Sequence, residues 1–213
     1  MLNLFDYFRS SACYRVRIAL NLKNLPYQKI PIHLINDGGE QFKEQYQLIN
    51  PQNLVPALQD GNKIITQSLA IIEYIDELHP EPPLLPKTPF EKALVRSFAL
   101  SIVADIHPLN NLRVLKYLSQ ELDISEEQKN RWYQHWINKG LIALEAKINS
   151  LNTKTDFCFG EQPSMADVCL IPQLYNAKRF SCDLRSFPTL LRIDAHCQNH
   201  SAFTNAFPVE ATM

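Results

Sequence analysis

The feature that most constrains the fold is a change of sequence pattern near residue 80. Before it, short apolar runs of strand length alternate with stretches of helical periodicity, whereas only long helical patterns follow residue 90. Between the two parts lies a proline-dense stretch, which cannot continue a helix and is typical of a semi-rigid connector. The pattern therefore predicts a domain over residues 1–80, a linker over 81–89 and a second domain over 90–213.

The N-terminal part has the pattern of a small mixed sheet. Two helical patterns, over residues 12–22 and after Thr66, interrupt its apolar runs. A strand that continues through a helix into a second strand implies a parallel pair, and the Asp-Gly-Asn turn at 60–62 implies an antiparallel hairpin. Strands are predicted over residues 2–7, 27–33, 56–59 and 63–66. These features are typical of a thioredoxin-like α/β domain.

The C-terminal part carries helical patterns only. They cover residues 90–122, 125–151, 164–180 and 187–197. Ser164 and Asp167 have the spacing of a capping box, which predicts a helix start at this position. Trp132 and Trp136 stand four residues apart, a spacing that predicts packing between helices. An all-helical domain is therefore expected.

The net charge of the chain excludes some partners. With 213 residues, a formal net charge of −1 and a pI near 6.6, the chain has no field that would gather nucleic acid or an anionic membrane. No run approaches the roughly 20 apolar residues that span a bilayer. The N-terminus also lacks the basic start of a signal peptide. We expect a cytoplasmic protein that binds neither nucleic acid nor membrane.

The cysteines are odd in number and scattered, without a Cys-x-x-Cys pair. They are Cys13, Cys158, Cys169, Cys182 and Cys197. This distribution predicts reduced thiols and argues against a disulfide framework or a structural zinc site. His196 and His200 could share a helix face, yet no carboxylate or thiol stands at a compelling ligand spacing, so we interpret them as a surface pair. No metal site is predicted.

Two hydroxyl groups stand where the first strand passes into the first helix. Ser10 and Ser11 lie where backbone amides are unpaired and the helix dipole is positive, which favours an anion. The plain alternative is that one serine only caps the helix, as serine often does. The turn is therefore a candidate anion site.

Two further segments can bind a peptide-like ligand. Pro56 keeps Val55 out of the α region, and an extended Val55 can offer its N–H and C=O in the manner of strand addition. The sequence does not establish whether their bond is cis, and an ordinary strand start is the alternative. Gln67 and Ser68 open the next helix, where they can bind a carboxylate or merely cap it. Together with the serine turn, these segments predict a cradle for a short anionic peptide with a thiol.

Several motifs resemble the zeta class of glutathione transferases. In the first half they are Ser10-Ser11, residues 15–20, Asn50-Pro51, Val55-Pro56 and residues 67–74; in the second half they are residues 106–111, 165–167 and 176–180. The match covers nearly the whole chain, and several of the motifs are specific to the class. It implies a thioredoxin-like domain followed by an all-helical domain, glutathione as the cofactor, and a homodimer.

The resemblance also implies which residues bind glutathione. They are Ser10, Ser11, Ala12, Cys13, Tyr14, Arg15, Gln41, Val55, Gln67, Ser68, His107, Asn111, Leu112 and Arg113. The two serines would be catalytic: Ser10 would contact the sulfur, with Ser11 beside it, while Val55 pairs with the cysteinyl backbone. Gln67 and Ser68 would hold the γ-glutamyl carboxylate, and Gln41 the glycyl end. Relatives read Ser-Ser-Cys-Ser-Trp at the turn, so no role of their cysteine transfers to Ala12.

The activity implied by the resemblance is isomerisation of a cis double bond by reversible thiolate addition. The expected substrate is a small dicarboxylate, maleylacetoacetate, which becomes fumarylacetoacetate in tyrosine and phenylalanine catabolism. Arg179 and, second, Arg9 would bind a substrate carboxylate, although Arg179 could be an ordinary surface residue. Maleylpyruvate or other zeta-class substrates, a redox enzyme using Cys13, and a non-catalytic binding protein are the alternatives. Cys13 could also be a packed apolar residue.

Overall fold

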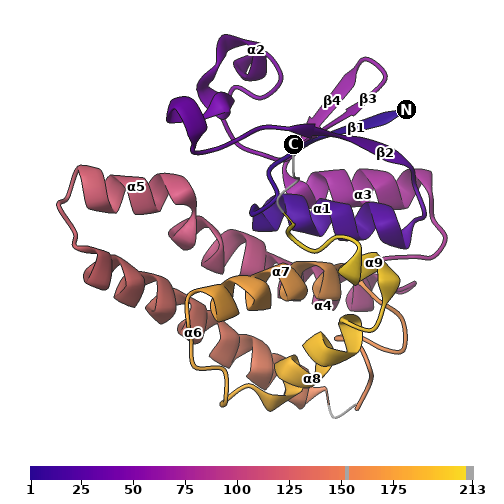
Figure 1. The fold of residues 1–213 in the computed structure, drawn as a ribbon. Coiled ribbons are helices and arrows are strands. Elements are labelled where there is room, and N and C mark those ends of the chain that lie inside the picture. The colour runs from indigo at the N-terminus through magenta and orange to yellow at the C-terminus, as the bar shows by residue number, and fades with distance from the viewer. Residues whose placement is uncertain (152–153, 210–213) are drawn as a thin grey trace. The chain divides into compact units, whose positions relative to one another are not determined.

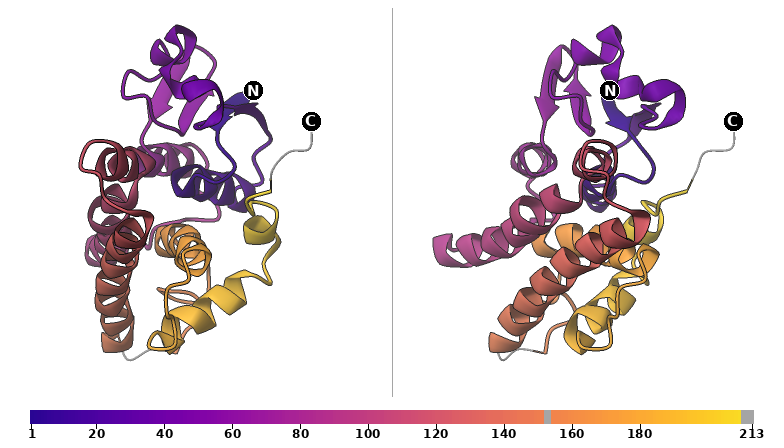
Figure 2. Two further views of the ribbon diagram at one scale, coloured as in Figure 1. Left: turned by 60° about the vertical axis from the view of Figure 1, so that its left-hand side comes forward. Right: turned by 90° about the vertical axis from the view of Figure 1, so that its left-hand side faces the viewer.

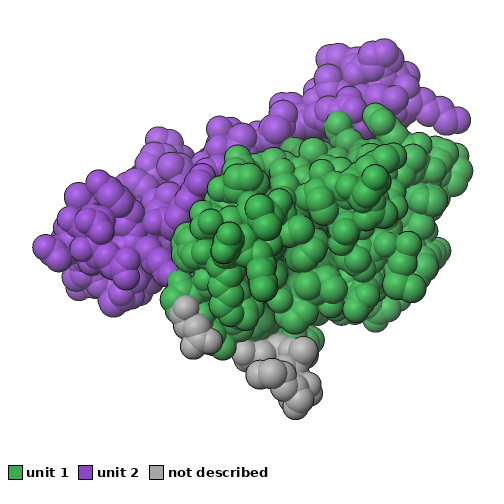
Figure 3. Space-filling model, turned by 90° about the horizontal axis from the view of Figure 1, so that it is seen from above, with its two compact units in different colours: residues 1–84, 199–213 green, residues 85–198 purple. Residues whose placement is uncertain are grey.

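The chain folds into two compact units. The computed structural model describes residues 1–151 and 154–209. One unit contains residues 1–84 together with the C-terminal segment from Asn199, and the other contains residues 85–198 (Figure 3). The division at residue 84 falls inside the linker expected from the sequence. The C-terminal segment departs from that expectation, because it was assigned to the helical domain.

The first unit is built on a mixed sheet. Within the described residues it has four strands, β1 (Leu2–Asp6), β2 (Tyr27–Pro31), β3 (Ala57–Asp60) and β4 (Lys63–Thr66), in the order β2-β1-β3-β4. The β1 and β2 strands are parallel, while β1 with β3 and β3 with β4 are antiparallel. Leu4 in the middle of β1 faces Lys29 on one side and Leu58 on the other. The predicted combination of a parallel pair and a hairpin is confirmed.

Two helices lie side by side along one face of this sheet, as Figures 1 and 2 show. They are α1 (Ser11–Leu22) and α3 (Ser68–Leu78). Val16, Ile72 and Ile75 are buried on them, as the helical spacing of their apolar residues requires. A short helix, α2 (Glu44–Gln47), follows the 3-10 turns Asn36–Gly38 and Glu40–Phe42 between β2 and β3.

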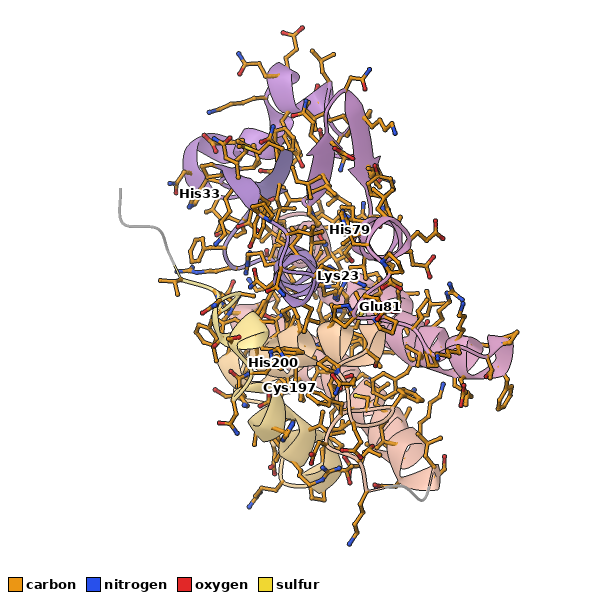
Figure 4. All side chains as sticks on the ribbon, turned by 90° about the vertical axis from the view of Figure 1, so that its right-hand side faces the viewer. Lys23, His33, His79, Glu81, Cys197 and His200 are labelled. Carbon is orange, nitrogen blue, oxygen red and sulfur yellow. The ribbon has the colours of Figure 1, made fainter. Side chains whose placement is uncertain are left out.

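A buried lysine fixes the point where the chain leaves the first unit. Lys23 follows the last residue of α1, and its side chain is fully buried. Its Nζ donates to Asp76 Oδ1 at 2.5 Å, to the His79 carbonyl at 2.6 Å and to the Pro82 carbonyl at 2.5 Å. Figure 4 labels Lys23 and His79 in this part of the unit. One cation thus holds the end of α3 and the start of the proline-dense stretch against α1.

The C-terminal segment belongs to the first unit because it bonds to α1. Its short helix α9 (Ser201–Thr204) begins after His200. Asn21 Nδ2 donates to the Ala202 carbonyl at 3.0 Å, and Arg17 Nε donates to the Ala206 carbonyl at 3.0 Å. Both donors are polar side chains of α1, and nothing local in the sequence marks their distant acceptors.

The second unit is helical. Its elements are α4 (Pro89–Leu100), a π-helical segment (Ser101–Ile106), a 3-10 turn (Pro108–Asn110), α5 (Leu112–Gln120), α6 (Glu126–Ser150), α7 (Met165–Arg179) and α8 (Pro188–Cys197). The sequence predicted one unbroken helical stretch over residues 90–122, and this was wrong. Pro108 has no N–H to continue the hydrogen-bond ladder, and Asn111 is extended with ψ of 146°, so the helix ends and restarts as α5. The periodic pattern hides the break because both sides are helical.

One local prediction for the second unit, the capping box, is confirmed. Ser164 and Asp167 form the capping box of α7, with Asp167 accepting the backbone N–H of Ser164 at 2.8 Å and that of Cys158 at 2.7 Å. The rings of Trp132 and Trp136 pack edge to face with their centroids 5.6 Å apart. The five cysteines are free, and only Cys182 among them is partly exposed.

Candidate functional site

The turn into α1 presents a serine hydroxyl at the positive end of the helix. Ser10 is the N-cap, and its Oγ accepts the backbone N–H of Cys13 at 3.2 Å. Its own N–H donates to the Tyr7 carbonyl at 2.9 Å, which fixes the turn. The cap expected from the sequence is real, yet a hydroxyl that accepts one bond still has a hydrogen to donate. Ser10 can therefore cap the helix and stabilise an anion at the same time.

The next residues point into the fold. Ser11 begins α1 and is buried, as are the side chains of Cys13 and Tyr14, while Ala12 is half-buried. The Cys13 Sγ accepts the Tyr7 N–H at 3.4 Å. Burial is the main reason that the pKa of the Cys13 thiol is raised well above its ordinary value. A thiol held protonated inside the core is a poor nucleophile, so the redox alternative based on Cys13 loses its chemical basis.

An arginine beneath this turn was missed as a site residue. Arg17 Nη1 lies 2.5 Å from Asp6 Oδ1, and both side chains are buried. The Arg17 Nη2 donates to the Phe8 carbonyl at 3.0 Å, two residues before Ser10. Arg17 therefore supports the turn from inside. The sequence did contain a signal: Arg17 is a charged residue between the apolar residues Val16 and Ile18 of a predicted helix.

The start of α3 forms a second polar corner. Gln67 precedes the helix with φ of 71°, a left-handed conformation that is rare for a residue with a side chain and often marks functional sites. Its side chain does not cap α3 and instead donates to Gln52 Oε1 at 2.8 Å. Ser68 is buried, and its Oγ accepts from Arg15 Nη1 at 3.3 Å. The corner thus combines a hydroxyl hydrogen, a buried guanidinium and a positive helix end, all of which favour a carboxylate.

The segment before β3 packs against the serine turn. Val55 is buried in one cluster with Tyr7, Cys13 and Tyr46. The Leu54 carbonyl accepts from Tyr46 Oη at 2.7 Å and from an asparagine amide at 2.7 Å, which holds the segment in place. The Val55–Pro56 bond is cis. The structure therefore brings Val55 and the start of α1 together, as a common ligand would require.

A buried glutamine lies in the loop between β2 and α2. Gln41 is 4% exposed, and its Nε2 donates to the Leu34 carbonyl at 3.4 Å. Among the residues that the structure describes, its Oε1 has no hydrogen-bond partner. Gly39, with φ of 107°, makes room for it, because a Cβ there would lie 2.6 Å from the Gln41 amide nitrogen. An unsatisfied buried acceptor of this kind fits a ligand N–H.

In the second unit, the expected residues cluster around the start of α5. His107 follows the π-helical segment, and its N–H donates to the Ile102 carbonyl at 2.9 Å. Asn111 caps α5 by accepting the Arg113 N–H at Oδ1 at 3.1 Å, and Leu112 is the first residue of the helix. The Arg113 side chain is exposed. Breaks of this type in a helix are frequent at functional sites.

The two candidate arginines are both exposed and rest on aromatic rings. Arg179 ends α7, and its guanidinium carbon lies 4.8 Å from the centroid of the Phe180 ring. Arg9 has the same relation to Phe8, also at 4.8 Å. Such contacts orient a guanidinium by placing it over the face of a ring.

Two kinds of feature are absent from residues 1–151 and 154–209. These residues contain no group of three or more His, Cys, Asp or Glu side chains arranged to hold a metal ion. None of their helices is both long and apolar enough to cross a bilayer.

His196 lies edge-on to Phe157, and His200 caps α9 by accepting the Ala202 N–H at 3.1 Å.

Known proteins share both the sequence and the fold. Residues 4–83 match the family described as glutathione S-transferase, N-terminal domain. A probable maleylacetoacetate isomerase of Vibrio cholerae is 49% identical over 205 residues, which cover 96% of this chain and 94% of that protein. The mouse maleylacetoacetate isomerase is 47% identical over 191 residues, 90% of this chain and 85% of that protein.

Two solved structures resemble this one along almost their whole length. A maleyl pyruvate isomerase, described as a bacterial glutathione S-transferase of the zeta class, superposes with a TM-score of 0.94 at 39% identity, covering 97% of this chain and 96% of that one. A maleylacetoacetate isomerase of Methylobacterium extorquens AM1, with malonate and glutathione bound, also has a TM-score of 0.94. It is 36% identical and covers 99% of this chain and 98% of its own.

Proposed function

Because this chain belongs to the glutathione S-transferase family, and to its zeta class, we propose that it is a glutathione-dependent isomerase that converts maleylacetoacetate to fumarylacetoacetate. The observation that carries the proposal is the geometry of Ser10. Its oxygen accepts the Cys13 N–H, which leaves the hydroxyl hydrogen to be donated to a ligand. The residues of the first unit also fit glutathione in charge and in hydrogen-bonding capacity.

Each part of glutathione has matching groups in the first unit. The Ser68 hydroxyl, with Arg15 behind it and Gln67 beside it, suits the γ-glutamyl carboxylate. Val55 offers its backbone to the cysteinyl residue, and the unpaired Gln41 Oε1 suits the N–H of the glycyl end. The start of α1 then faces the sulfur. For the residues at the start of α5 in the second unit, His107, Asn111, Leu112 and Arg113, a role in glutathione binding stays a prediction.

The chain acts on the thiol through its hydroxyl and amide donors. Glutathione supplies a thiol that adds to and leaves a conjugated double bond, which lets the bond rotate between the two events. Ser10, with Ser11 beside it, holds the sulfur as an anion, together with the positive end of α1. A free thiol has a pKa of about 8.5, so only a few per cent is ionised at neutral pH. A hydroxyl bond and the helix end together lower that pKa by about one to two units.

The substrate carboxylates need a cation on the helical unit. Arg179 is proposed to bind one of them, because a planar guanidinium matches a carboxylate with two parallel bonds. Arg9, next to Ser10, is the second candidate. Both side chains are exposed.

A second substrate is favoured by the relatives themselves. A protein of Ralstonia that is 39% identical over 207 residues is named maleylpyruvate isomerase. Maleylpyruvate has the same conjugated cis double bond and two acidic ends, so the same residues could act on it. The ratio of kcat/KM values for the two substrates decides which one this chain prefers.

We also propose a cytoplasmic homodimer. Reduced, mostly buried cysteines suit a reducing compartment. Sedimentation of the purified protein measures its assembly, and fractionation of cells measures its location. A monomer, or a secreted protein, contradicts this part of the proposal without touching the chemistry.

The experiment that tests the function combines the purified chain, glutathione and maleylacetoacetate, and follows the appearance of fumarylacetoacetate. Ser10→Ala should raise the pKa of the bound thiol by about one unit and slow turnover about tenfold at neutral pH. Ser10→Thr keeps a hydroxyl and the cap, so it is the matched control and should retain most activity. Formation of product without glutathione, or full activity in Ser10→Ala, would contradict the proposed mechanism.

A further inference from the structure

A short stretch of α6, residues 132–134, holds the turn that contains His107 and Asn111. The Trp132 Nε1 donates to the Leu109 carbonyl at 2.8 Å. The Asn110 Nδ2 donates to the Tyr133 carbonyl at 3.2 Å. The first bond satisfies a backbone carbonyl of the 3-10 turn, and both bonds attach this turn to α6.

Packing strengthens the same attachment about two turns further along α6. A Cβ on Gly140 would lie 2.2 Å from the Cδ1 of Ile106, far inside van der Waals contact. Ile106 ends the π-helical segment, directly before His107, and is 2% exposed. The glycine thus permits the close approach that places the turn against the helix.

Two residues of this stretch, Tyr133 and Gln134, also hold the end of α7. The rings of Tyr133 and Phe180 are stacked, with centroids 3.6 Å apart and planes 16° from parallel. Gln134 Nε2 donates to the Phe180 carbonyl at 2.8 Å. Since successive side chains of a helix point about 100° apart, three neighbouring residues can reach elements on different sides of it.

The stacked pair lies directly against Arg179. The Arg179 guanidinium rests on the Phe180 ring, and its charge acts on the Tyr133 hydroxyl: burial raises the pKa of Tyr133, while Arg179 opposes that rise. An exposed arginine loses considerable rotamer freedom when a ligand orders it. A ring that is itself held rigid reduces this loss before the substrate arrives.

We propose that Tyr133 is a positioning residue: by stacking on Phe180 it preorganises Arg179 for a substrate carboxylate, and through α6 it places Arg179 in register with the turn at residues 107–111. This inference rests on the proposed function, specifically on the role of Arg179. It makes Tyr133 a determinant of affinity for the dicarboxylate substrate, without contact between Tyr133 and the substrate.

The test is a double-mutant cycle on the full-length protein, with steady-state kinetics for maleylacetoacetate and for glutathione. Tyr133→Leu removes the stack and should raise the KM for maleylacetoacetate about five- to tenfold, the range of an aromatic pair. The KM for glutathione should change less than about twofold, since a loss of preorganisation acts on one ligand only. Tyr133→Phe keeps the stack and should restore the wild-type KM. Combined with Arg179→Ala, Tyr133→Leu should add nothing.

Two further variants control for damage to the fold. Gln134→Ala removes one hydrogen bond and should move the same KM in the same direction by about two- to threefold. Phe159→Leu removes another aromatic pair of the unit, which Phe159 forms with Phe98 at 5.8 Å, and should leave both KM values unchanged. If Tyr133→Leu does not fold, Gln134→Ala with and without Arg179→Ala completes the cycle.

The outcomes separate the inference from the function on which it rests. An inactive wild-type protein refutes the proposed function. An active protein in which Arg179→Ala leaves the substrate KM unchanged refutes the role of Arg179, and the inference with it. Where Arg179→Ala does raise the KM, equal effects of Tyr133→Leu on both ligands, or additive effects in the double variant, overturn the positioning role alone.

Discussion

The buried guanidinium of Arg17 should be the most sensitive single group in the first unit. It pairs with the Asp6 carboxylate at 2.5 Å and donates to two carbonyls, those of Phe8 and Ala206, at 3.0 Å each. The side chains of Arg17 and Asp6 are 2% and 8% exposed. Arg17→Met keeps most of the volume of the side chain and removes the charge and all its donors.

The expected loss follows from these contacts. An unpaired carboxylate left in the core costs about 3–5 kcal/mol, and each carbonyl that loses its donor costs about 1 kcal/mol. The unfolding free energy of the first unit should therefore fall by about 5–7 kcal/mol, a large part of the 5–15 kcal/mol typical of a folded protein. Asp6→Asn removes the stranded charge, so the double variant Asp6→Asn/Arg17→Met should recover about 2–3 kcal/mol relative to Arg17→Met.

Urea denaturation of the four proteins in this cycle measures the effect. The chain has two tryptophans, Trp132 and Trp136, and both lie in the helical unit. Tryptophan fluorescence therefore follows the second unit, whereas amide hydrogen exchange in α1 follows the first. We expect protection in α1 to collapse in Arg17→Met and glutathione binding to weaken with it, because the Phe8 carbonyl lies at the serine turn.

A surface ion pair provides the matched control. Arg185 pairs with Asp183 at 2.6 Å, but their side chains are 90% and 59% exposed. Arg185→Met should leave the urea transition unchanged, since water and salt screen exposed pairs. The reasoning is refuted if Arg17→Met loses less than about 2 kcal/mol, or if the Asp6→Asn substitution brings no recovery in its background.

Three further predictions concern single side chains. The pKa of Glu40 is lowered chiefly by the His33 N–H, so its stabilising effect is present above the ordinary carboxyl pKa of about 4.3 and is lost as the pH falls through the lowered value. Glu40→Gln should thus show faster amide exchange in its loop at neutral pH but match the wild type in acid; a difference that persists in acid contradicts this. Asp167→Ala leaves the donors of the α7 capping box unsatisfied and should lower the Tm by about 10 °C, from a loss of about 3–5 kcal/mol, in a calorimetric scan. A shift within error would show that water replaces the carboxylate. Cys13 should resist iodoacetamide in the native protein and react after unfolding, as mass spectrometry can show, and Cys13→Ala should remain active; stoichiometric labelling of the native protein would revive the redox alternative.

Most of the fold could be predicted from local sequence patterns. Strand and helix periodicity placed the four strands and most of the longer helices to within a few residues, because side chains two, three or four positions apart decide which face of an element is apolar. The short helix α9 (Ser201–Thr204) was not predicted. The capping residues Ser10 and Ser164 were recognisable because their hydroxyl oxygens accept backbone N–H groups only two or three residues further along the chain. The break at Pro108 was missed, since a helical pattern continues on both sides of it.

The resemblance to a known class supplied candidates for the site, but the sequence did not indicate what supports them. Arg17 donates to the carbonyl of Ala206, which is 189 residues away along the chain. Tyr133 of α6 stacks on Phe180, which directly follows α7. Contacts of this kind depend on which surfaces the packed elements bring together, and no short-range pattern encodes them. The sequence by itself determined the elements and their order, through interactions within a turn or a pleat. Only the tertiary structure decided that the buried Arg17 supports the serine turn and that Tyr133 stacks on the Phe180 ring.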